Sequence, residues 1–396
     1  MKDILPCSTK QWRHMVNQIY EIILARGYHE IIMHCMEHKE VFAALGQTSD
    51  IVSKEMYYLT DSELVLRPEG TASFMRAVLE HNLLDKQCGL FYFGPMFRKE
   101  RPQQGRWREF YQVGIEHLAV QPCNNIGQEL EILVTSYKLF NALGLIDKVQ
   151  LHINNLGTVS ERISYKENLV KYFQNHLNDL SPSQVDTLQK NPLRLLDSKE
   201  PNLKDLVSQS PSIDKYTDNT EFQALIQQLI IHIPEDKITI DTKLVRGLDY
   251  YTGTVFEWKL ANAGSQDTLC AGGRYDLLFV NNHHLGTVSA FGCGIGVDRM
   301  FFYLNDNKFE QNSNEDIYVA GLDAFSLVEN LRTLGYKVIY STLLRSVNFH
   351  KAQSYQCQIF IYQDKNQYLI HKQADSYIAI SLEEVLIKVA ELISFN

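Results

Sequence analysis

The sequence lacks the features of a membrane-embedded, secreted or zinc-bound protein. It contains no apolar run of about 18 residues, the length that a membrane-spanning helix needs, and residues 1–15 lack the apolar core of a signal peptide. Its seven cysteines are scattered, odd in number and never spaced as C-x-x-C, which disfavours both a disulfide framework and a zinc site. These absences predict a cytoplasmic protein that has no membrane partner.

A surplus of positive charge is missing as well. The 396 residues include 47 acidic side chains against 38 lysines and arginines, which gives a net charge of -9. Non-specific nucleic-acid binding needs a broad basic surface, so this balance disfavours a general coating protein and leaves room for one RNA bound through a local patch. The length predicts two or three domains, and 45% hydrophobic residues are enough to build their cores.

Positive charge is nevertheless concentrated in one stretch, residues 90–119. The stretch alternates apolar and polar residues on both sides of a central loop, which predicts a β-hairpin. Its loop region carries five cations: Arg98, Lys99, Arg101, Arg106 and Arg108. Because like charges repel, such a cluster indicates a site for a polyanion, with a solvated loop as the alternative. On the returning strand Phe110, Gln112 and Glu116 share one face, and an aromatic ring beside arginines suits a nucleotide.

This hairpin closely resembles motif 2 of class II aminoacyl-tRNA synthetases, in the version found in bacterial histidyl-tRNA synthetases. Further segments resemble the same family, in the family's order along the chain. They are Glu-Gly-Thr at residues 69–71, LVRGLDYYTGTV at 244–255, AGGRYD at 271–276 and SAFGCGIGVDRM at 289–300. Each segment alone fits an ordinary strand end, turn or close packing, but their shared order is not credible as chance.

The N-terminal part is similar to motif 1, which builds the dimer interface of the family, so a homodimer is expected. This part consists of a helical stripe over residues 8–26 and a predicted strand over residues 28–37. His34 stands where motif 1 normally has proline, and Asp298 stands where motif 3 more often has glutamate. Residues 64–71 are predicted to form a short strand followed by a turn.

The resemblance implies an α+β catalytic core, a class II synthetase antiparallel sheet flanked by helices, with a helical insertion and a C-terminal α/β domain similar to an anticodon-binding domain. The implied domains are residues 1–156 with 239–305 for the discontinuous core, 157–238 for the insertion, 306–314 for a linker and 315–396 for a shortened C-terminal domain. NPLRLLDSK at residues 191–199 matches a signature of the bacterial insertion. The C-terminal segment is predicted to alternate strand and helix, and only Arg345-Ser346 in it matches a family motif.

The implied function is ATP-dependent activation of L-histidine to histidyl-adenylate and transfer of the histidine to the 3' end of tRNA(His). Activation brings the carboxylate of histidine to the α-phosphorus of ATP, so positioned positive charge is the main requirement. By resemblance, Arg98 and Arg246 act there as catalytic residues. Arg299 is expected on the γ-phosphate and Phe110 against adenine, so that these four residues bind ATP. Mg²⁺ is expected to neutralise the outer phosphates, and no protein side chain is assigned to it.

Selection of histidine needs hydrogen-bond partners for both imidazole nitrogens, because other amino acids then leave those partners unpaired. The residues that the resemblance assigns to the histidine site are Glu69, Thr71, Gln112, Glu116, Tyr250, Tyr251 and Tyr275. The residues that it assigns to the acceptor end of the tRNA are Gln103, Gln104 and Arg106.

Two other functions stay open. A non-catalytic paralogue of the family senses histidine and regulates ATP phosphoribosyltransferase, and Tyr111 gives it some support because true synthetases more often have histidine there. The other is a catalytically dead tRNA-binding module. The intact Arg98, Arg246 and Arg299, together with the insertion signature, favour the synthetase over both.

Overall fold

The structure, a computed structural model, contains two compact units, Met1–Lys308 and Phe309–Asn396. The residues that it describes are 3–45, 51–84, 89–100, 105–120, 125–198, 200–246, 250–261, 267–279, 288–304, 317–321, 324–341, 357–364, 367–372 and 375–394. Gln103, Gln104 and the Arg345-Ser346 pair therefore lie outside the described residues. Among the described helices, none is long and apolar enough to cross a membrane.

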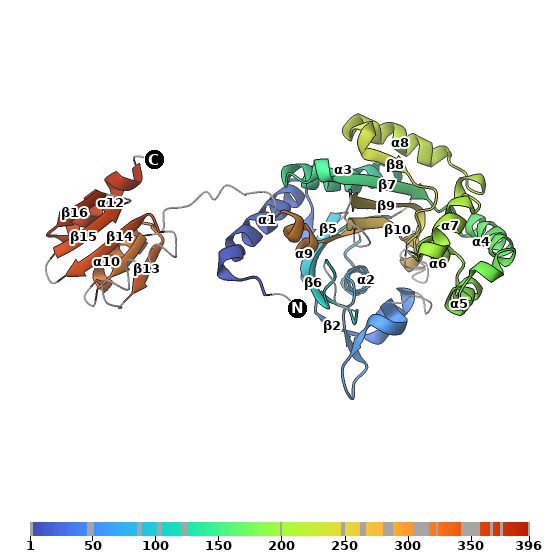
Figure 1. Cartoon of the computed structure of the whole chain (residues 1–396), viewed down its shortest axis with the longest axis horizontal. Coiled ribbons are helices and arrows are strands. Elements are labelled where there is room, and N and C mark those ends of the chain that lie inside the picture. Colours follow the sequence, from blue (N-terminus) through green and yellow to red (C-terminus); the bar gives the residue numbers. More distant parts are fainter. Residues whose placement is uncertain are drawn as a thin grey trace. The chain divides into compact units, whose positions relative to one another are not determined.

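An eight-stranded mixed sheet, with strand order β1-β5-β6-β11-β10-β9-β7-β8, organises the first unit (Figure 1). Its six inner strands pair antiparallel: β5 (Gly89–Phe97), β6 (Glu109–Val120), β11 (Val288–Gly296), β10 (Thr268–Arg274), β9 (Thr252–Leu260) and β7 (Val149–Asn155). The edge strands β1 (His29–Glu30) and β8 (Ile238–Ile240) run parallel to their neighbours. The predicted hairpin is confirmed, since all of β5 pairs antiparallel with residues 109–117 of β6.

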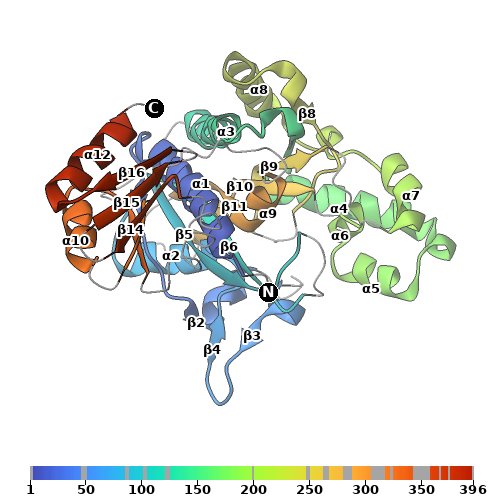
Figure 2. The same ribbon diagram turned by 60° about the vertical axis from the view of Figure 1, so that its left-hand side comes forward.

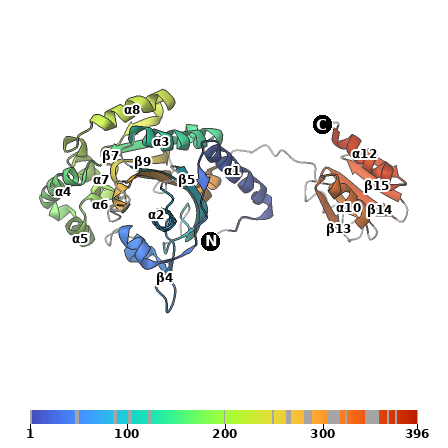
Figure 3. The same ribbon diagram turned by 180° about the vertical axis from the view of Figure 1, so that it is seen from behind.

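Four helices pack around this sheet: α1 (Pro6–Leu24), α2 (Thr71–Glu80), α3 (Asn125–Ala142) and α9 (Val297–Leu304). The rings of Phe91 and Phe93 lie against Tyr20 of α1, whereas the ring of Tyr92 lies against Phe74 of α2. Because successive side chains of a strand point to opposite faces, α1 and α2 cover opposite faces of β5. Figure 3 shows the two helices on either side of that strand.

The predicted insertion is helical, as expected. Its helices are α4 (Val159–Gln174), α5 (Pro182–Lys190), α6 (Leu193–Leu196), α7 (Lys204–Gln209) and α8 (Thr220–His232). Helices α4 and α5 each begin with a capping box, at Thr158 and Ser181, which satisfies backbone N–H groups that the first turn leaves free. Figure 2 shows α4 to α7 gathered at one end of the unit, while α8 lies beside α3.

Helices α4, α5 and α6 of the insertion share a hydrophobic cluster with the rest of the first unit. Tyr165, Leu169 and Phe173 of α4 are fully buried and belong to the same apolar cluster as Phe74 of α2 and Tyr92 of β5. Their packing therefore joins the insertion to the elements around the predicted site. The finer division of the first unit into a core and an insertion domain stays a prediction.

Smaller elements complete the first unit. A three-stranded sheet has the order β2-β4-β3, with β2 (Met36–His38), β4 (Leu64–Leu66) and β3 (Tyr57–Tyr58). Short helical segments other than α-helices are η1 (Lys39–Leu45), η2 (Ile51–Glu55), η3 (Ile146–Lys148), η4 (Leu177–Asp179), η5 (Pro201–Leu203), η6 (Ile213–Lys215), η7 (Glu235–Lys237) and η9 (Asp276–Phe279).

The second unit has its own core and a five-stranded sheet of order β13-β12-β14-β15-β16. Its elements are β12 (Ile317–Ala320), α10 (Phe325–Thr333), β13 (Val338–Ser341), β14 (Ile359–Asp364), β15 (Gln367–Lys372), β16 (Asp375–Ala379) and α12 (Leu382–Ser394). The predicted alternation of strand and helix is correct up to β14, but it misses the antiparallel pair β15 and β16. These two strands have mostly exposed or half-buried residues, and their apolar runs are only three residues long, which hides them in the sequence.

The predicted strand over residues 28–37 is wrong, because two short strands, β1 and β2, replace it. Between them the buried guanidinium of Arg67 donates hydrogen bonds to the carbonyls of Met33 at 3.2 Å and His34 at 3.4 Å. The same side chain also donates to the carbonyl of Pro95 at 2.9 Å. A side chain thus satisfies the backbone where a strand ladder was expected.

The turn predicted after β4 does not extend to Thr71, because this residue is the first residue of helix α2. The carboxylate of Glu69 accepts hydrogen bonds from the backbone N–H groups of Thr71 and Ala72, both at 2.8 Å. Glu69 thus caps the N-terminus of the helix. Glutamate is less usual in this role than serine or aspartate, so the sequence did not indicate where the helix begins.

We expect Arg67→Met to lower the free energy of unfolding of the first unit by about 2–4 kcal/mol, because one buried and two partly buried carbonyl groups lose their donor. Urea unfolding followed by circular dichroism measures the change. The matched control is Arg332→Met, which removes a cation whose ion pair with Glu329 lies at the surface of the other unit, with an expected cost of less than about 0.5 kcal/mol. Equal small shifts in both variants would show that the Arg67 contacts carry no stability.

Candidate active site

The segments singled out in the sequence meet in one pocket of about 660 Å³. Strands β6, β9, β10 and β11 and helix α9 carry much of its lining, and Figure 2 shows how they adjoin. The predicted residues that line the pocket are Glu69, Thr71, Arg98, Arg106, Phe110, Gln112, Arg246, Tyr250, Tyr251 and Arg299. The structure therefore gathers residues that lie more than 200 positions apart along the chain, from 69 to 299.

Glu116 is the buried acidic centre at one end of this group, with 1% of its surface exposed. Its carboxylate accepts hydrogen bonds from the hydroxyls of Thr71 at 3.1 Å, Tyr92 at 3.4 Å and Tyr275 at 2.7 Å. Burial raises the pKa of Glu116 to about 8, although the three hydroxyl donors oppose this shift. Neither Glu116 nor Tyr275 is among the residues that line the pocket: Glu116 lies directly behind the lining residue Thr71, and Tyr275 is joined to it. Their role in binding histidine stays a prediction.

The glycines of β11 make room for the side chains of β6. Gly292 pairs with Glu116 and Gly294 pairs with Gln112 across the two strands. A Cβ atom at either glycine would lie 1.7 Å from the polar end of the paired side chain. These two glycines are thus needed by the neighbouring strand, and of the three glycines of the motif Gly296 is the one with no close neighbour, since the nearest atoms to its Cβ position lie 3.8 Å away.

Gln112 is ready to accept a hydrogen bond from a ligand. Its Oε1 atom is buried and has no donor among the described residues, while the residue itself lines the pocket. Buried amide oxygens are rarely left without a partner in native structures, so this atom marks a place for a donor group of a bound molecule. The rings of Tyr250 and Tyr251 lie 4.6 Å apart in the same pocket, and Tyr275 lies 6.2 Å from Tyr250.

Three guanidinium groups occupy the other end of the pocket. Arg98 donates to the carbonyl of Pro68 at 2.8 Å, and its guanidinium lies 5.3 Å from the centre of the Phe110 ring. Arg299 donates to the carbonyls of Gly105, at 3.0 Å, and Thr268. Burial lowers the pKa of Arg98, and the charge of Arg246 adds to that effect. Burial likewise lowers the pKa of Arg299, with Arg98 as the next cause.

Arg246, the remaining cation, forms an ion pair with Glu257 of β9. Its Nε atom is buried and has no acceptor among the described residues. The arrangement therefore combines repelling cations and an unused donor, which suits a polyanionic ligand.

Arg106 also lines this end of the pocket, but its charge is engaged. It forms an ion pair with Glu100 and a longer contact with Glu55 at 3.4 Å. A role in binding the tRNA would require Arg106 to leave these carboxylates, and that role stays a prediction.

Several lining residues were not assigned from the sequence. They are Glu257 and Lys259 on β9, Thr268 and Cys270 on β10, and Asp197 from the insertion signature. Glu257 and Lys259 stand two residues apart in a strand that is otherwise mostly buried, so their alternation was a usable signal. Tyr92, behind Glu116, was hidden because a tyrosine in an apolar strand looks like ordinary packing.

Tyr111 faces away from the pocket. Its ring stacks on Phe93, with centroids 5.3 Å apart, and meets Trp12 of α1 edge-on at 5.7 Å. The backbone N–H of Tyr111 donates to the carboxylate of Asp298, and burial raises the pKa of that carboxylate to about 6. Asp298 therefore supports strand β6, and its replacement of glutamate leaves Arg299 in the pocket.

Comparisons with known proteins agree with this site. A family model described as Histidyl-tRNA synthetase matches residues 1–299. The chain is 40% identical over 351 residues to the histidine–tRNA ligase of Legionella pneumophila (strain Philadelphia 1), which covers 84% of this chain and 80% of that protein. It is 38% identical over 362 residues to the histidine–tRNA ligase of Laribacter hongkongensis, covering 86% and 82% of the two chains.

Among solved structures, the apo histidyl-tRNA synthetase of S. aureus has a TM-score of 0.74 to this chain at 26% identity, covering 98% of this chain and 97% of that one. Its likeness confirms the predicted α+β architecture of a large sheet flanked by helices followed by a C-terminal α/β unit. Since the family model spans three quarters of the sequence and the relatives match most of it, the chain belongs to the histidyl-tRNA synthetase family.

Proposed function

We propose that this chain activates L-histidine with ATP to form histidyl-adenylate and transfers the histidine to the 3' end of tRNA(His). The observation that carries the proposal is a single pocket with hydrogen-bonding groups for an amino acid at one end and three partly buried guanidinium groups, those of Arg98, Arg246 and Arg299, at the other. Its family membership supports the same reaction, because its relatives are named as histidine–tRNA ligases.

In this proposal the imidazole of histidine lies between Glu116 and Gln112, close to the three tyrosines 250, 251 and 275. The imidazole binds in its neutral form, so its one N–H donates to the ionised carboxylate of Glu116 and its other nitrogen accepts a hydrogen bond from a tyrosine hydroxyl. The free acceptor on Gln112 then takes an N–H of the ammonium group. The ammonium group lies near Glu69 and Thr71. Each oxygen of the Glu69 carboxylate accepts one backbone N–H, so a second lone pair on each remains for the ammonium.

Activation needs no general base, because the carboxylate of histidine is already ionised. One of its oxygens attacks the α-phosphorus, the bond from that phosphorus to the bridging oxygen breaks, and pyrophosphate leaves with the electron pair. Arg98 and Arg246 stabilise the charge at the α-phosphate, Arg299 takes the γ-phosphate and Phe110 lies against adenine. Arg246 can turn to the phosphate as its bond to Glu257 lengthens.

Mg²⁺ enters this scheme with ATP and neutralises the outer phosphates. Among the described residues, no group of three His, Cys, Asp or Glu side chains is arranged to hold a metal ion. In this proposal the phosphates therefore carry the metal. The acceptor end of the tRNA is expected at the hairpin loop with Gln103, Gln104 and Arg106, two copies of the chain pair through motif 1, and the enzyme works in the cytoplasm.

The residue that favoured the regulatory paralogue, Tyr111, does not support that function in the structure. Tyr111, which is unusual for a synthetase, contacts α1 rather than the pocket. Its identity therefore does not change the residues that face the substrates, and the paired cations of the pocket have no evident use in a protein that binds histidine alone.

We expect the full chain to catalyse histidine-dependent exchange of pyrophosphate into ATP. Radioactive exchange with each of the standard amino acids measures this directly, and histidine should be the one that supports it. Folded protein that binds histidine but gives no exchange would favour the regulator.

We expect Arg246→Ala to lower kcat for the exchange by about 100-fold to 1000-fold, because one of the two cations at the α-phosphate is lost. ATP should still bind within about fivefold of the wild-type affinity, since Arg98, Arg299 and Phe110 remain. Lys190→Ala, which removes an exposed cation of the insertion, is the control and should change neither value. A parallel loss of ATP affinity and kcat would mean that Arg246 serves ATP binding alone.

We expect histidine affinity to depend on pH through Glu116. With a pKa near 8, the free carboxylate is mostly protonated at pH 7, and binding requires the ionised form. The dissociation constant should therefore fall about tenfold for each unit of pH between 6.5 and 7.5 and level off above 8, with release of about one proton at pH 7. Titration calorimetry in buffers of different ionisation enthalpy measures both. Glu116→Gln should bind weakly and without this slope, whereas a wild-type affinity that is flat over this range would contradict the assignment.

A further inference from the structure

The segment between β8 and β9 carries Arg246, Tyr250 and Tyr251, three of the residues that line the pocket. Its described residues, 241–246 and 250–251, form no helix or strand. A segment without a regular ladder of hydrogen bonds has to be held by other parts of the molecule if its side chains are to stay in place. The contacts that hold it therefore bear on the position of Arg246.

Some of these contacts come from the sheet. The backbone N–H of Asp241 donates to the carbonyl of Ile153 at 2.9 Å, and the amide of Asn154 donates to the carbonyl of Leu244 at 2.8 Å. Both partners belong to β7. They fix the start of the segment, before Arg246.

The insertion supplies a second set of contacts through Lys243. The ammonium group of this residue donates to the hydroxyl of Ser210 and to the carbonyls of Ser210 and Pro211, of which the hydroxyl and the Pro211 carbonyl lie at 2.9 Å. The hydroxyl of Tyr165 on α4 donates to the same Pro211 carbonyl at 3.0 Å. Three acceptors of the insertion thus converge on one cation, three positions before Arg246.

The insertion also holds the far end of the segment. Arg162, on the second turn of α4, donates to the backbone carbonyl of Tyr251. Two backbone hydrogen bonds follow, from Gly253 to the carbonyl of Gly157 at 3.0 Å and from Leu156 to the carbonyl of Gly253 at 2.7 Å. The segment is therefore fastened to the insertion on both sides of Arg246.

Apolar packing connects the same parts. Leu244 and Val245, which precede Arg246, are buried in one cluster with Tyr165 of α4 and Leu195 of α6. Displacing the insertion would expose these side chains to water, which is unfavourable for apolar groups. The polar contacts of Lys243 and Arg162 thus act at the border of a shared core.

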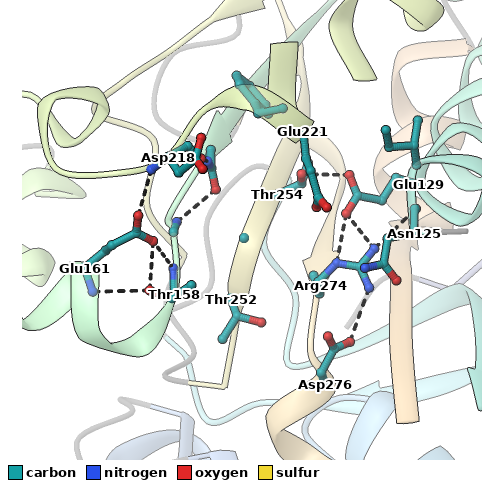
Figure 4. A pocket seen from close by; sticks show the side chains of 15 residues that line it. Asn125, Glu129, Thr158, Glu161, Asp218, Glu221, Thr252, Thr254, Arg274 and Asp276 are labelled. Carbon is teal, nitrogen blue, oxygen red and sulfur yellow. Dashed lines mark hydrogen bonds and ion pairs between the residues drawn. The ribbon is translucent and has the colours of Figure 1, made fainter. Parts of the chain in front are cut away.

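A second pocket, of about 400 Å³, separates the insertion from the sheet farther along. Figure 4 shows its two walls: Glu161 bonds to Thr158 and Asp218 on the insertion side, and Arg274 bonds to Glu129 on the sheet side. Asn155 of β7 also lines this pocket and joins its walls, because its amide donates to the carbonyl of Asp218 at 3.2 Å and to Asn219 at 3.1 Å. Those bonds hold the insertion to the sheet, whereas Lys243 and Arg162 join it to the segment that carries Arg246.

We propose that Lys243 and Arg162 are positioning residues, through which the insertion holds the segment that carries Arg246, Tyr250 and Tyr251. Amino-acid activation then depends on the insertion before any tRNA is bound. This inference rests on the proposed function, because it concerns the geometry of the same pocket.

The first test is histidine-dependent pyrophosphate exchange by the full chain without tRNA. Lys243→Met should lower kcat at least about tenfold while the KM for ATP stays within about threefold, because the ATP groups on the hairpin and on α9 are untouched. Lys243→Arg, which keeps the charge and the donors, should recover most of the rate. The control is Lys215→Met, an exposed lysine of the insertion that lies near Lys243.

Arg162 is tested in the same assay. Arg162→Met should raise the KM for histidine at least about fivefold, because the backbone beside the Tyr251 ring loses its anchor. Arg162→Lys should restore part of the affinity, and Lys171→Met, an exposed cation on the same helix, should behave as wild type. Wild-type kinetics in both Lys243→Met and Arg162→Met would overturn the proposal.

A readout that is independent of catalysis separates this inference from the proposed function. Hydrogen–deuterium exchange of residues 241–252 should become faster in Lys243→Met than in Lys215→Met, with the rest of the first unit unchanged. If the wild type shows no pyrophosphate exchange, the proposed function fails. Faster deuterium uptake in Lys243→Met would still support the role of Lys243 in holding the segment. Unchanged deuterium uptake in the segment would contradict the positioning role of Lys243 even if the enzyme is active.

Discussion

Much of this structure holds three guanidinium groups together in one pocket against their mutual repulsion. Arg98, Arg246 and Arg299 are brought together from three distant parts of the chain, and burial already disfavours the charge on two of them. Each is held by different contacts. Arg98 contacts a backbone carbonyl and an aromatic ring, Arg246 pairs with a carboxylate, and Arg299 donates to two backbone carbonyls. A polyanion relieves the repulsion, so folding free energy that is spent on assembling the site is available as binding energy for ATP.

The other end of the pocket follows a different rule. Glu116 and Gln112 lie on the central strand β6, and Gly292 and Gly294 on the adjacent strand leave the space that these side chains fill. A carboxylate buried in this way is costly to ionise, as its raised pKa shows. That cost becomes specificity, because a ligand without matching N–H groups would neither offset the cost of ionising Glu116 nor pair the buried amide of Gln112.

Much of this site could be predicted from the sequence, because its residues stand in local motifs whose order along the chain is itself informative. The hairpin with Arg98 and Phe110 and the helix with Arg299 were found in this way. Contacts between motifs could not be found: nothing near Glu257 in the sequence indicates that it would pair with Arg246, and Glu69 gives no sign of capping α2. The limits of β1 and α2 were missed for the same reason, since side chains from elsewhere replace the expected backbone bonds.

The two ends of the pocket are built on different kinds of backbone, and their chemistry explains the difference. Discrimination between amino acids depends on groups that do not move, so Gln112 and Glu116 belong to a strand that is paired on both sides. Transfer of the adenylyl group requires cations that exchange partners during the reaction, and Arg246 stands on a segment without regular structure, paired with a carboxylate that it can leave. Arg246 can change partners without losing its place in the pocket only if the two ends of this segment are fixed. The sheet fixes one side, and the insertion, through a shared core and two cationic side chains, fixes both.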